Sequence, residues 1–318
     1  MCKKKHSSER VEYLMKIYLN SPKESWVVDR FVKEWKLSNP NLTTKFISRS
    51  DIVWVISPWT WKSISKRYLN SKKVICTIHH IDKIKFDADD FLELDKYVDK
   101  YHIISTKTAG TLAEITEKPF FYAPFWIDEK KFYTIDNKEE VRKKYNFLDE
   151  QYLVGSFQRD TEGHDNLSPK LEKGPDNFIK IVQNFNSKIN NLHVVLTGKR
   201  RDFVINKLQE LDISYSYFPM IDTVALNELY NCLNLYIVSS RVEGGPQSIV
   251  ECAITKTPII STDVGIASEI LANESIFTME NYSNAIPNID IPYQNVINYK
   301  IPMGFEVFIN EFKALYEN

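Results

Sequence analysis

Short apolar runs rich in β-branched and aromatic residues alternate with longer amphipathic segments along nearly the whole chain. Such runs lie at residues 11–19, 51–57, 73–79, 101–105 and 120–124, and again at 152–157, 192–198, 213–218, 235–240, 258–262 and 275–279. Strands that are apolar on both faces and that alternate with helices form parallel sheets covered by helices. The pattern therefore predicts an α/β protein with two Rossmann-like, doubly wound domains.

Between these runs, apolar residues recur at helical spacing, which predicts helices near residues 26–35, 177–185, 224–233 and 246–254. The end of the chain has the same spacing at Phe305, Phe308, Phe312 and Leu315. We therefore expect the chain to close with an amphipathic helix that packs back onto the protein.

The glycines are distributed unevenly between the two halves. Gly110 is the only glycine before residue 150, and the other eight follow it, several of them at strand ends. In doubly wound sheets, ligands bind outside the carboxyl ends of the strands, where glycine lets a phosphate approach the backbone. We expect the second half to bind a nucleotide, with a first domain over 1–126, a second over 127–301 and the closing helix within 302–318.

Charge and cysteine content argue against several classes of protein. Lys and Arg number 41 against 42 Asp and Glu, so the overall charge does not indicate nucleic-acid binding. Four widely spaced cysteines and six histidines without ligand spacing indicate neither a disulfide framework nor a metal site. No run approaches the ~20 apolar residues that span a bilayer. We expect a cytoplasmic protein, and a peripheral contact with the inner face of the membrane stays open.

The segment 235–271 carries the most specific chemistry in the chain. A predicted strand ends at Ser240, and the loop RVEGGP leads into a helix that opens near Pro246. Paired glycines allow close approach to the backbone, and the N–H groups at the start of a helix can hold an anion. Glu243 and Glu251 could face the reacting end and the vicinal hydroxyls of one ligand. Taken singly, each is also typical of a helix start or a solvated helix face.

The stretch from Ser240 to Ile270 resembles the donor-binding signature of glycosyltransferase family 4. That signature reads approximately S-R-x-E-G-x-P-x-x-x-x-E-A-x-A-x-G-x-P-V-I-x-T-x-x-G-G-x-x-E-I, and both glutamates match it. Departures from it are Cys252, Lys256 and Ile266. FFYAPFWIDEKKF also resembles the family's interdomain segment, so the resemblance extends over nearly the whole chain, with a shortened first domain. It implies the GT-B fold and retaining transfer from a nucleotide sugar, with no metal or other cofactor.

The resemblance also implies roles for individual residues. In the GSFQRDTEGHDNLSPKLEKGPD stretch, Arg159 and Lys173 would hold the diphosphate, while Glu251 would bind the ribose. The donor-binding residues are then expected to be Arg159, Lys173, Gly244, Gly245, Pro246, Ser248 and Glu251, and the catalytic residues Glu243 and His79. His79 ends a strand in a T-x-H run, and because side chains alternate along a strand, only one of His79 and His80 should face the cleft.

Two positions in the first half depart from simple patterns. LNSPKESW stands where the family has a glycine-rich turn, so either Ser21–Ser25 replaces the turn or the first domain contributes less to the donor. Asp87 and Asp89 have the D-x-D form of a metal site, but they precede the helix-like run FLELDKYV. We interpret them as a helix cap.

Two sets of side chains could bind ligand or serve the fold. Arg200 and Arg201 follow a predicted strand, and we favour solvated side chains over contacts with phosphate. The tryptophans of WVISPWTW could stack on a sugar or lie buried in the first domain; they are Trp54, Trp59 and Trp61.

The expected function is transfer of a hexose from a nucleotide-diphosphate sugar to a glycan or lipid-linked glycan acceptor. Two alternatives stay open. A nucleotide-sugar epimerase also uses two facing Rossmann-like domains and would need no acceptor. A non-catalytic protein that binds a glycan or a nucleotide sugar with the same fold would show binding without turnover.

Overall fold

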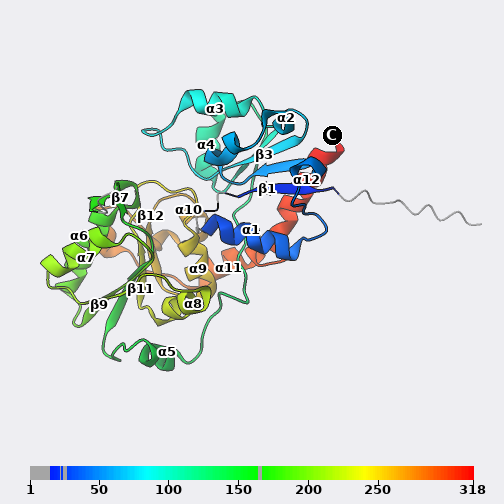
Figure 1. The fold of residues 1–318 in the computed structure, drawn as a ribbon. Helices are drawn as coiled ribbons and strands as arrows, with labels where there is room; N and C mark the ends of the chain where they lie inside the picture. Colours follow the sequence, from blue (N-terminus) through cyan, green and yellow to red (C-terminus); the bar gives the residue numbers. More distant parts are fainter. Residues whose placement is uncertain (1–14, 22, 24–26, 164–166) are drawn as a thin grey trace, which may run out of the picture.

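The computed structural model describes residues 15–21, 23, 27–163 and 167–318. Two parallel sheets, one of five strands and one of six, form two lobes that face each other (Figure 1). The predicted α/β class with two Rossmann-like units is confirmed.

The first sheet has the strand order β1-β2-β3-β4-β5, all parallel. Its strands are β1 (Ile17–Asn20), β2 (Ile52–Val55), β3 (Lys73–Ile78), β4 (Lys100–Ile103) and β5 (Phe120–Tyr122). The helices between them are α1 (Val27–Ser38), α2 (Lys66–Leu69), α3 (Ala88–Asp95) and α4 (Thr106–Ala113).

The edge of this sheet beside β1 is cut short. After α1 the chain forms a single parallel bridge from Thr43 to Ile17, on the side of β1 opposite β2. The chain then crosses to β2 instead of extending a strand there. Beyond β1 the described chain therefore adds a one-residue bridge to the sheet, and the shortened first domain stays a prediction.

Each face of the first sheet has its own apolar cover. Trp54 and Ile75 point to the face covered by α1, by the segment at 125–126 and by α12 (Glu306–Glu317). Val55 and Cys76 point to the other face, which α2, α3 and α4 cover. Strands buried on both faces read as continuous apolar runs, which is why the sequence pattern located them.

The second sheet has the order β10-β9-β6-β11-β12-β13, again all parallel. Its strands are β6 (Tyr152–Ser156), β9 (Leu192–Thr197), β10 (Tyr215–Phe218), β11 (Leu235–Val238), β12 (Ile259–Thr262) and β13 (Ile276–Phe277). In chain order this is the 3-2-1-4-5-6 arrangement of a doubly wound sheet, whose order reverses between β6 and β11. A ligand crevice is therefore expected at the carboxyl ends of these two strands.

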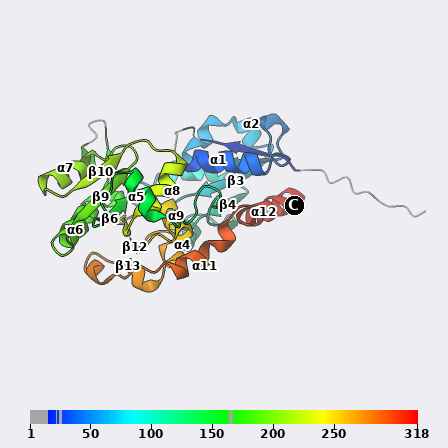
Figure 2. The ribbon, with the colours of Figure 1, turned by 90° about the horizontal axis from the view of Figure 1, so that it is seen from below.

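Helices cover both faces of the second sheet (Figures 1 and 2). One face carries α6 (Pro175–Asn186) and α7 (Asp202–Glu210). The other carries α5 (Lys138–Lys144), α8 (Thr223–Cys232), α9 (Gln247–Thr255), α10 (Ala267–Ile270) and α11 (Asp290–Val296).

The closing helix returns to the first sheet, as predicted. In α12, Phe308 and Phe312 are fully buried, and their rings meet Trp35 and Trp54 edge-on or tilted. The C-terminus thus lies beside the first lobe although α11 lies on the second (Figure 2). A helix from the end of the chain completes the core formed by its beginning.

Some sequence-based expectations need adjustment. The first strand begins at Ile17, later than the run at 11–19 suggested, and residues 11–14 lie outside the described part of the chain. The small antiparallel hairpin of β7 (Thr161–Glu162) and β8 (Ser168–Pro169) was not predicted. Two-residue strands have too little periodicity to be recognised in a sequence.

Asp87 is confirmed as a helix cap, since it accepts a hydrogen bond from the Asp90 N–H at the start of α3 at 2.9 Å. The division into domains at 126–127 and 301–302 stays a prediction. The two crossing segments do meet there, because Ile127 donates to Tyr299 and accepts from Ile301. Within the described residues, no helix has the length and apolar character needed to cross a bilayer.

Candidate functional site

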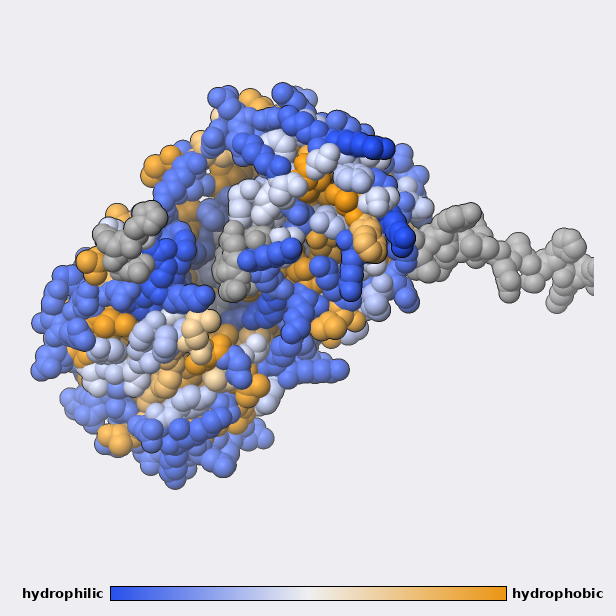
Figure 3. All heavy atoms as spheres, viewed as in Figure 1, coloured by the Kyte–Doolittle hydropathy of each residue, from blue (hydrophilic) through white to orange (hydrophobic). Residues whose placement is uncertain are grey.

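The candidate site lies where the two lobes face each other, at the carboxyl ends of β6 and β11. The loop after β6 runs to Gly174, and the loop after β11 runs from Ser239 to Pro246. A hollow between the lobes with hydrophilic residues around its rim is visible in Figure 3. Part of it is a pocket of about 160 Å³ that His80, Lys107, Arg241, Glu243 and other residues line.

Glu243 and Lys173 form an ion pair at this place, each from one of the two loops. The Ser240 hydroxyl donates to the same Glu243 oxygen at 3.2 Å, and the Gln158 amide donates to the Lys173 carbonyl at 2.9 Å. The structure therefore brings the expected Lys173 and Glu243 together. It places an ammonium and a carboxylate at the switch point of the sheet, where ligands bind in doubly wound folds.

Arg241 fastens the two loops to each other. Its guanidinium makes a bidentate pair with Asp176 at 2.7 and 2.6 Å, and it also donates to the Leu171 carbonyl at 2.9 Å. The backbone N–H of Arg241 donates to the Glu172 carbonyl at 2.8 Å. Bidentate arginine–carboxylate pairs fix geometry as well as adding energy. Arg241 thus positions Lys173 relative to Glu243.

Two glycines permit backbone contacts that no side chain would allow. Gly174 has φ +59°, and a Cβ there would lie 1.9 Å from the Ser239 carbonyl oxygen. A Cβ on Gly244 would lie 1.4 Å from the carbonyl oxygen of His79 in the first lobe. The loop with Glu243 and the end of β3 are consequently in direct backbone contact.

Helix α9 begins directly behind this loop. Pro246 is its N-cap residue, one position earlier than the first-turn place that the sequence suggested, and its side chain makes no capping hydrogen bond with the described residues. Ser248 lies beside the Tyr236 hydroxyl, which also accepts a hydrogen bond from Phe157 N–H at 3.0 Å. Uncapped N–H groups next to Gly244 and Gly245 suit an anionic ligand.

Glu251 has partners that the sequence did not indicate. Its carboxylate accepts from Arg30 of α1 at 2.7 Å and from the Tyr230 hydroxyl at 2.8 Å, and the residue is 5% exposed. Arg30 belongs to the first lobe and Glu251 to the second, so the pair bridges them. Because Arg30 already donates to the Glu251 carboxylate, a ribose at Glu251 would have to bind together with Arg30 or displace it.

A group of cations surrounds the loop after β6. Arg159 is exposed, and Lys170 is half-buried. Burial, followed by the charges of Arg159 and Lys173, lowers the pKa of Lys170. Across the interface, Lys85 pairs with Glu172. A bound anion would offset the positive charges that lower the pKa of Lys170, so this group suits a diphosphate.

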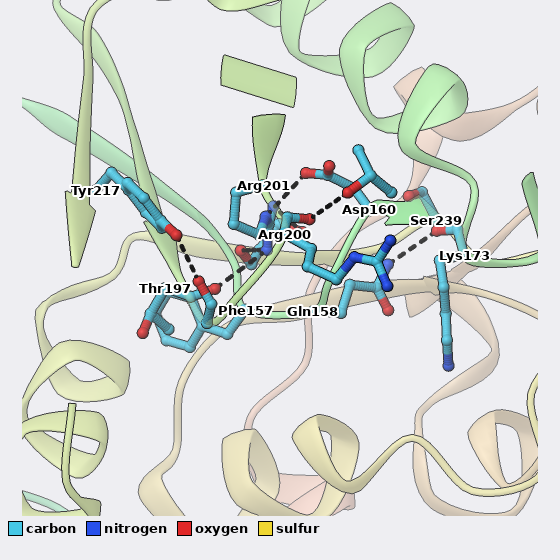
Figure 4. A network of polar contacts seen from close by, with 12 residues as sticks. Phe157, Gln158, Asp160, Lys173, Thr197, Arg200, Arg201, Tyr217 and Ser239 are labelled. Atoms are coloured by element: carbon cyan, nitrogen blue, oxygen red, sulfur yellow. Dashed lines mark hydrogen bonds and ion pairs between the residues drawn. The ribbon is translucent and has the colours of Figure 1, made fainter. Parts of the chain in front are cut away.

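Arg201 corrects the expectation of a solvated side chain. It is buried, donating to Asp160 at 2.9 Å and to the Ser156 carbonyl at 2.6 Å (Figure 4). Burial raises the pKa of Asp160 to about 6, against the opposing effect of Arg201. Arg200 donates to the Gly163 carbonyl and is half-buried, so it too is not fully solvated. Arg201 therefore stabilises the loop from within, and Lys173 extends from the other side of it.

The two neighbouring histidines point to different places. The His79 ring bonds the Ile56 carbonyl at 2.8 Å and lies 5.9 Å from the Phe125 ring, and burial lowers its pKa to about 4. His80 lines the pocket that Glu243 lines, and Glu243 and Lys173 both influence its pKa, which burial lowers. His80 is thus the one whose side chain faces Glu243. The catalytic role of His79 stays a prediction.

Further contacts join the lobes on the α4 side. Glu269 accepts from the backbone N–H and hydroxyl of Thr106 at 2.7 and 2.8 Å, and also from Tyr122. Lys107 pairs with Asp263 at 2.5 Å. Glu269 is the penultimate position of the family-like signature, so part of that signature serves the contact between lobes.

Sequence reasoning gave no role to Arg30, Lys170 or Arg241. For Arg241 the available signal was its place as the arginine of the S-R-x-E-G signature, and for Arg30 it was the scarcity of arginine, nine residues against 32 lysines. Arginine is favoured for buried and bidentate ion pairs. Nothing separates Lys170 from the other lysines in the sequence.

Comparison with known families identifies the second lobe. Residues 137–286 match the family model described as Glycosyl transferases group 1. The chain carries a glycosyl transferases group 1 domain. This match covers the whole Lys173–Glu243 arrangement. No curated protein sequence was found to match the chain.

Solved glycosyltransferases share the fold over most of the chain. HepE from Anabaena in complex with UDP and glucose aligns with a TM-score of 0.74 and 10% identity, covering 95% of this chain and 100% of that one. A glycosyltransferase from Rickettsia africae gives 0.69 and 15%, covering 96% and 99%. Pneumococcal O-GlcNAc transferase GtfA in complex with UDP and GlcNAc gives 0.61 and 12%, covering 84% and 57%. At these identities the likeness establishes the fold, which is GT-B.

Proposed function

We propose that this group 1 glycosyltransferase transfers a hexose from a UDP-sugar to a glycan or lipid-linked glycan acceptor, with retention of configuration. The observation that carries the proposal is the Lys173–Glu243 pair at the carboxyl ends of β6 and β11, directly before the uncapped start of α9. The choice of UDP is supported by the fold relatives HepE and GtfA, whose structures contain it.

The donor side of the proposal assigns each part of a nucleotide sugar to residues in the second lobe. Arg159 and Lys173 hold the diphosphate, with the Gly244 and Gly245 amides and the helix start around Pro246 and Ser248 at the β-phosphate. Glu243 fixes the sugar, and Glu251 takes the ribose hydroxyls. Side-chain cations then stabilise the charge on the leaving phosphate.

In the proposed reaction, the bond between the sugar C1 and the phosphate oxygen breaks while the acceptor oxygen bonds to C1 on the same face. The acceptor proton passes to the departing phosphate oxygen, so no separate base is needed. Contact between the Gly244 loop and the end of β3 excludes water that would hydrolyse the donor.

The acceptor side is supported by the first lobe. Trp54 and Trp61 are buried, whereas Trp59 is 48% exposed and lies 5.9 Å from the His79 ring. An indole face exposed beside the cleft can stack on the apolar face of a sugar. We assign the acceptor hydroxyl or the transferred sugar to the surroundings of His79.

The test uses the full chain with UDP-, GDP-, ADP- and TDP-sugars and a mixture of oligosaccharide and lipid-linked acceptors, with and without EDTA. We expect sugar transfer with a UDP-sugar, insensitive to EDTA and at least about tenfold slower in Glu243→Gln, since a charged hydrogen bond is lost. Glu139→Gln on exposed α5 is the control and should keep the full rate.

The other outcomes distinguish the alternatives. An altered sugar released without an acceptor would indicate an epimerase. Stabilisation by UDP-sugar with no turnover on any acceptor would indicate a binding protein. Full transfer by Glu243→Gln would overturn the assigned role of this residue.

A further inference from the structure

Arg30 is the side chain of the first lobe that reaches Glu251. It lies in α1, 221 residues before Glu251, and donates from Nη1 to Oε1 at 2.7 Å. Side chains of both residues are largely buried, at 18% and 6% exposed. An ion pair so removed from solvent has to be well satisfied, because desolvation of both charges is costly.

The pair is incompletely satisfied. Arg30 Nε and Nη2 are buried and have no hydrogen-bond partner among the described residues. The nearest further carboxylate is Glu34, 3.9 Å from Nε and engaged with Trp126 and Lys131. Buried donors without a partner are uncommon in native proteins, and an acceptor on a bound ligand would satisfy these two.

Glu251 also has capacity left. A carboxylate offers about four lone-pair sites, and Arg30 and Tyr230 each use one, on different oxygens. The guanidinium is held between the rings of Phe31 and Phe132, at 5.5 and 5.0 Å from their centroids. The Arg30 guanidinium therefore offers unused N–H donors, and the neighbouring Glu251 carboxylate still offers lone pairs that can accept hydrogen bonds.

We propose that Arg30 and Glu251 together bind the 2′- and 3′-hydroxyls of the nucleotide ribose, one residue from each lobe. This rests on the proposed function, which places the ribose at Glu251. A vicinal diol is both donor and acceptor: its O–H groups donate to the Glu251 carboxylate, while its oxygens accept from Arg30 Nη2. A deoxyribose would leave one of these partners unsatisfied.

This assignment also gives the first lobe a part in donor recognition. The family's glycine-rich turn is missing after β1, and residues 22 and 24–26 of that connection lie outside the described part of the chain. Helix α1 starts directly after it and presents Arg30 to the second lobe. Selection of a ribonucleotide then requires both lobes in contact.

The experiment compares the dissociation constants of UDP and 2′-deoxy-UDP by calorimetry for the wild-type chain, Arg30→Met and the control Arg67→Met. Arg67 is exposed on α2. We expect the wild type and the control to prefer UDP by about tenfold or more, as loss of a charged hydrogen bond implies. Arg30→Met should lower that preference to about threefold or less, with a cooperative thermal transition showing that it is folded.

An unchanged preference in folded Arg30→Met would overturn the inference, and tighter UDP binding would show instead that Arg30 competes with the ribose. The variant Glu251→Gln distinguishes failure of the Arg30 assignment from failure of the proposed function. If Glu251→Gln loses the preference and Arg30→Met keeps it, only the role of Arg30 fails. If the wild type binds no UDP, or Glu251→Gln keeps the preference, the ribose assignment itself fails.

Discussion

The two faces of the cleft are built differently. The second-lobe face consists of two loops that hydrogen bonds join at several points, with Arg241, Ser240 and Gln158 fixing Lys173 and Glu243. The first-lobe face presents single side chains from separate elements, Arg30 from α1 and His80 after β3, and the proposed acceptor site adds Trp59 after β2. One face is a connected loop pair, and the other is a set of independent contributions.

The difference has a physical reason and a functional consequence. A diphosphate requires converging charges and backbone amides at fixed distances, which a connected loop pair provides. Independent side chains can change one at a time without disturbing the rest. We therefore expect substitutions on the second face to abolish transfer, and substitutions on the first to alter which molecule is bound.

Gly244 is where the faces touch, and its substitution should have the largest effect. In Gly244→Ala the new Cβ would lie 1.4 Å from the His79 carbonyl oxygen, so the lobes must separate. Displacement by about 1 Å can cost on the order of a hundredfold in rate, and we expect a fall of that order in sugar transfer. Gly110→Ala is the control, since its Cβ would meet nothing within 4 Å. Wild-type rates in Gly244→Ala would show that the contact is irrelevant to transfer.

Arg241→Lys tests whether the connection between the two loops of the second-lobe face is needed for transfer. Lysine keeps the charge but loses the bidentate pair with Asp176 and the donation to Leu171. We expect transfer to fall about tenfold through misplacement of Lys173, as one charged hydrogen bond implies. The measurement is kcat together with the UDP dissociation constant. An unchanged kcat would mean that the loops hold each other without Arg241.

Trp59→Ala tests the first face. Loss of a stacking platform should raise the acceptor KM about three- to tenfold, from roughly 0.5–1.5 kcal/mol of aromatic contact, and leave UDP binding unchanged. Phe46→Ala, which removes another exposed aromatic ring, is the control. Equal losses in donor and acceptor binding would contradict the separation of the two faces.

The smallest expected effect is on the pH dependence of folding stability, to which buried groups of the two lobes contribute with opposite sign. Burial lowers the pKa of His79 to about 4 and that of His102 to about 3, so both are neutral in the folded first lobe. Between pH 6.5 and 4 the unfolded chain binds more protons at these groups, so they reduce stability as the pH falls. Asp160 in the second lobe has its pKa raised to about 6 and acts in the opposite direction.

We therefore expect the thermal midpoint to be nearly constant from pH 8 to 7 and to decrease below pH 6.5. Scanning calorimetry across this range measures it. Asp160→Asn removes the opposing group, and should steepen the decrease if the variant folds. A midpoint that rises on acidification in Asp160→Asn, which lacks the opposing group, would show that the histidines are charged in the folded protein.

Much of this was determined by the sequence alone. The apolar runs located every strand of the two main sheets. Central strands such as β2 and β11 are apolar throughout because they are buried on both faces, whereas the edge strands β5 and β10 are only partly buried and were recognised by their aromatic residues. The resemblance of the stretch after β11 to the family signature located the loop of Glu243, and the same resemblance indicated Lys173, which precedes Gly174–Pro175 and forms the ion pair with Glu243. Strands and loop motifs depend on residues that are close together in the sequence, so the sequence alone can predict them.

Tertiary structure decided what lies between the lobes. Nothing in the spacing pairs Arg30 with Glu251, turns His80 rather than His79 toward Glu243, or buries Arg201 on Asp160. Such contacts join segments tens to hundreds of residues apart, and they depend on how two independently patterned sheets are placed. Hydrophobic periodicity fixes each sheet, but polar contacts across a cleft follow only from the geometry of the assembled chain.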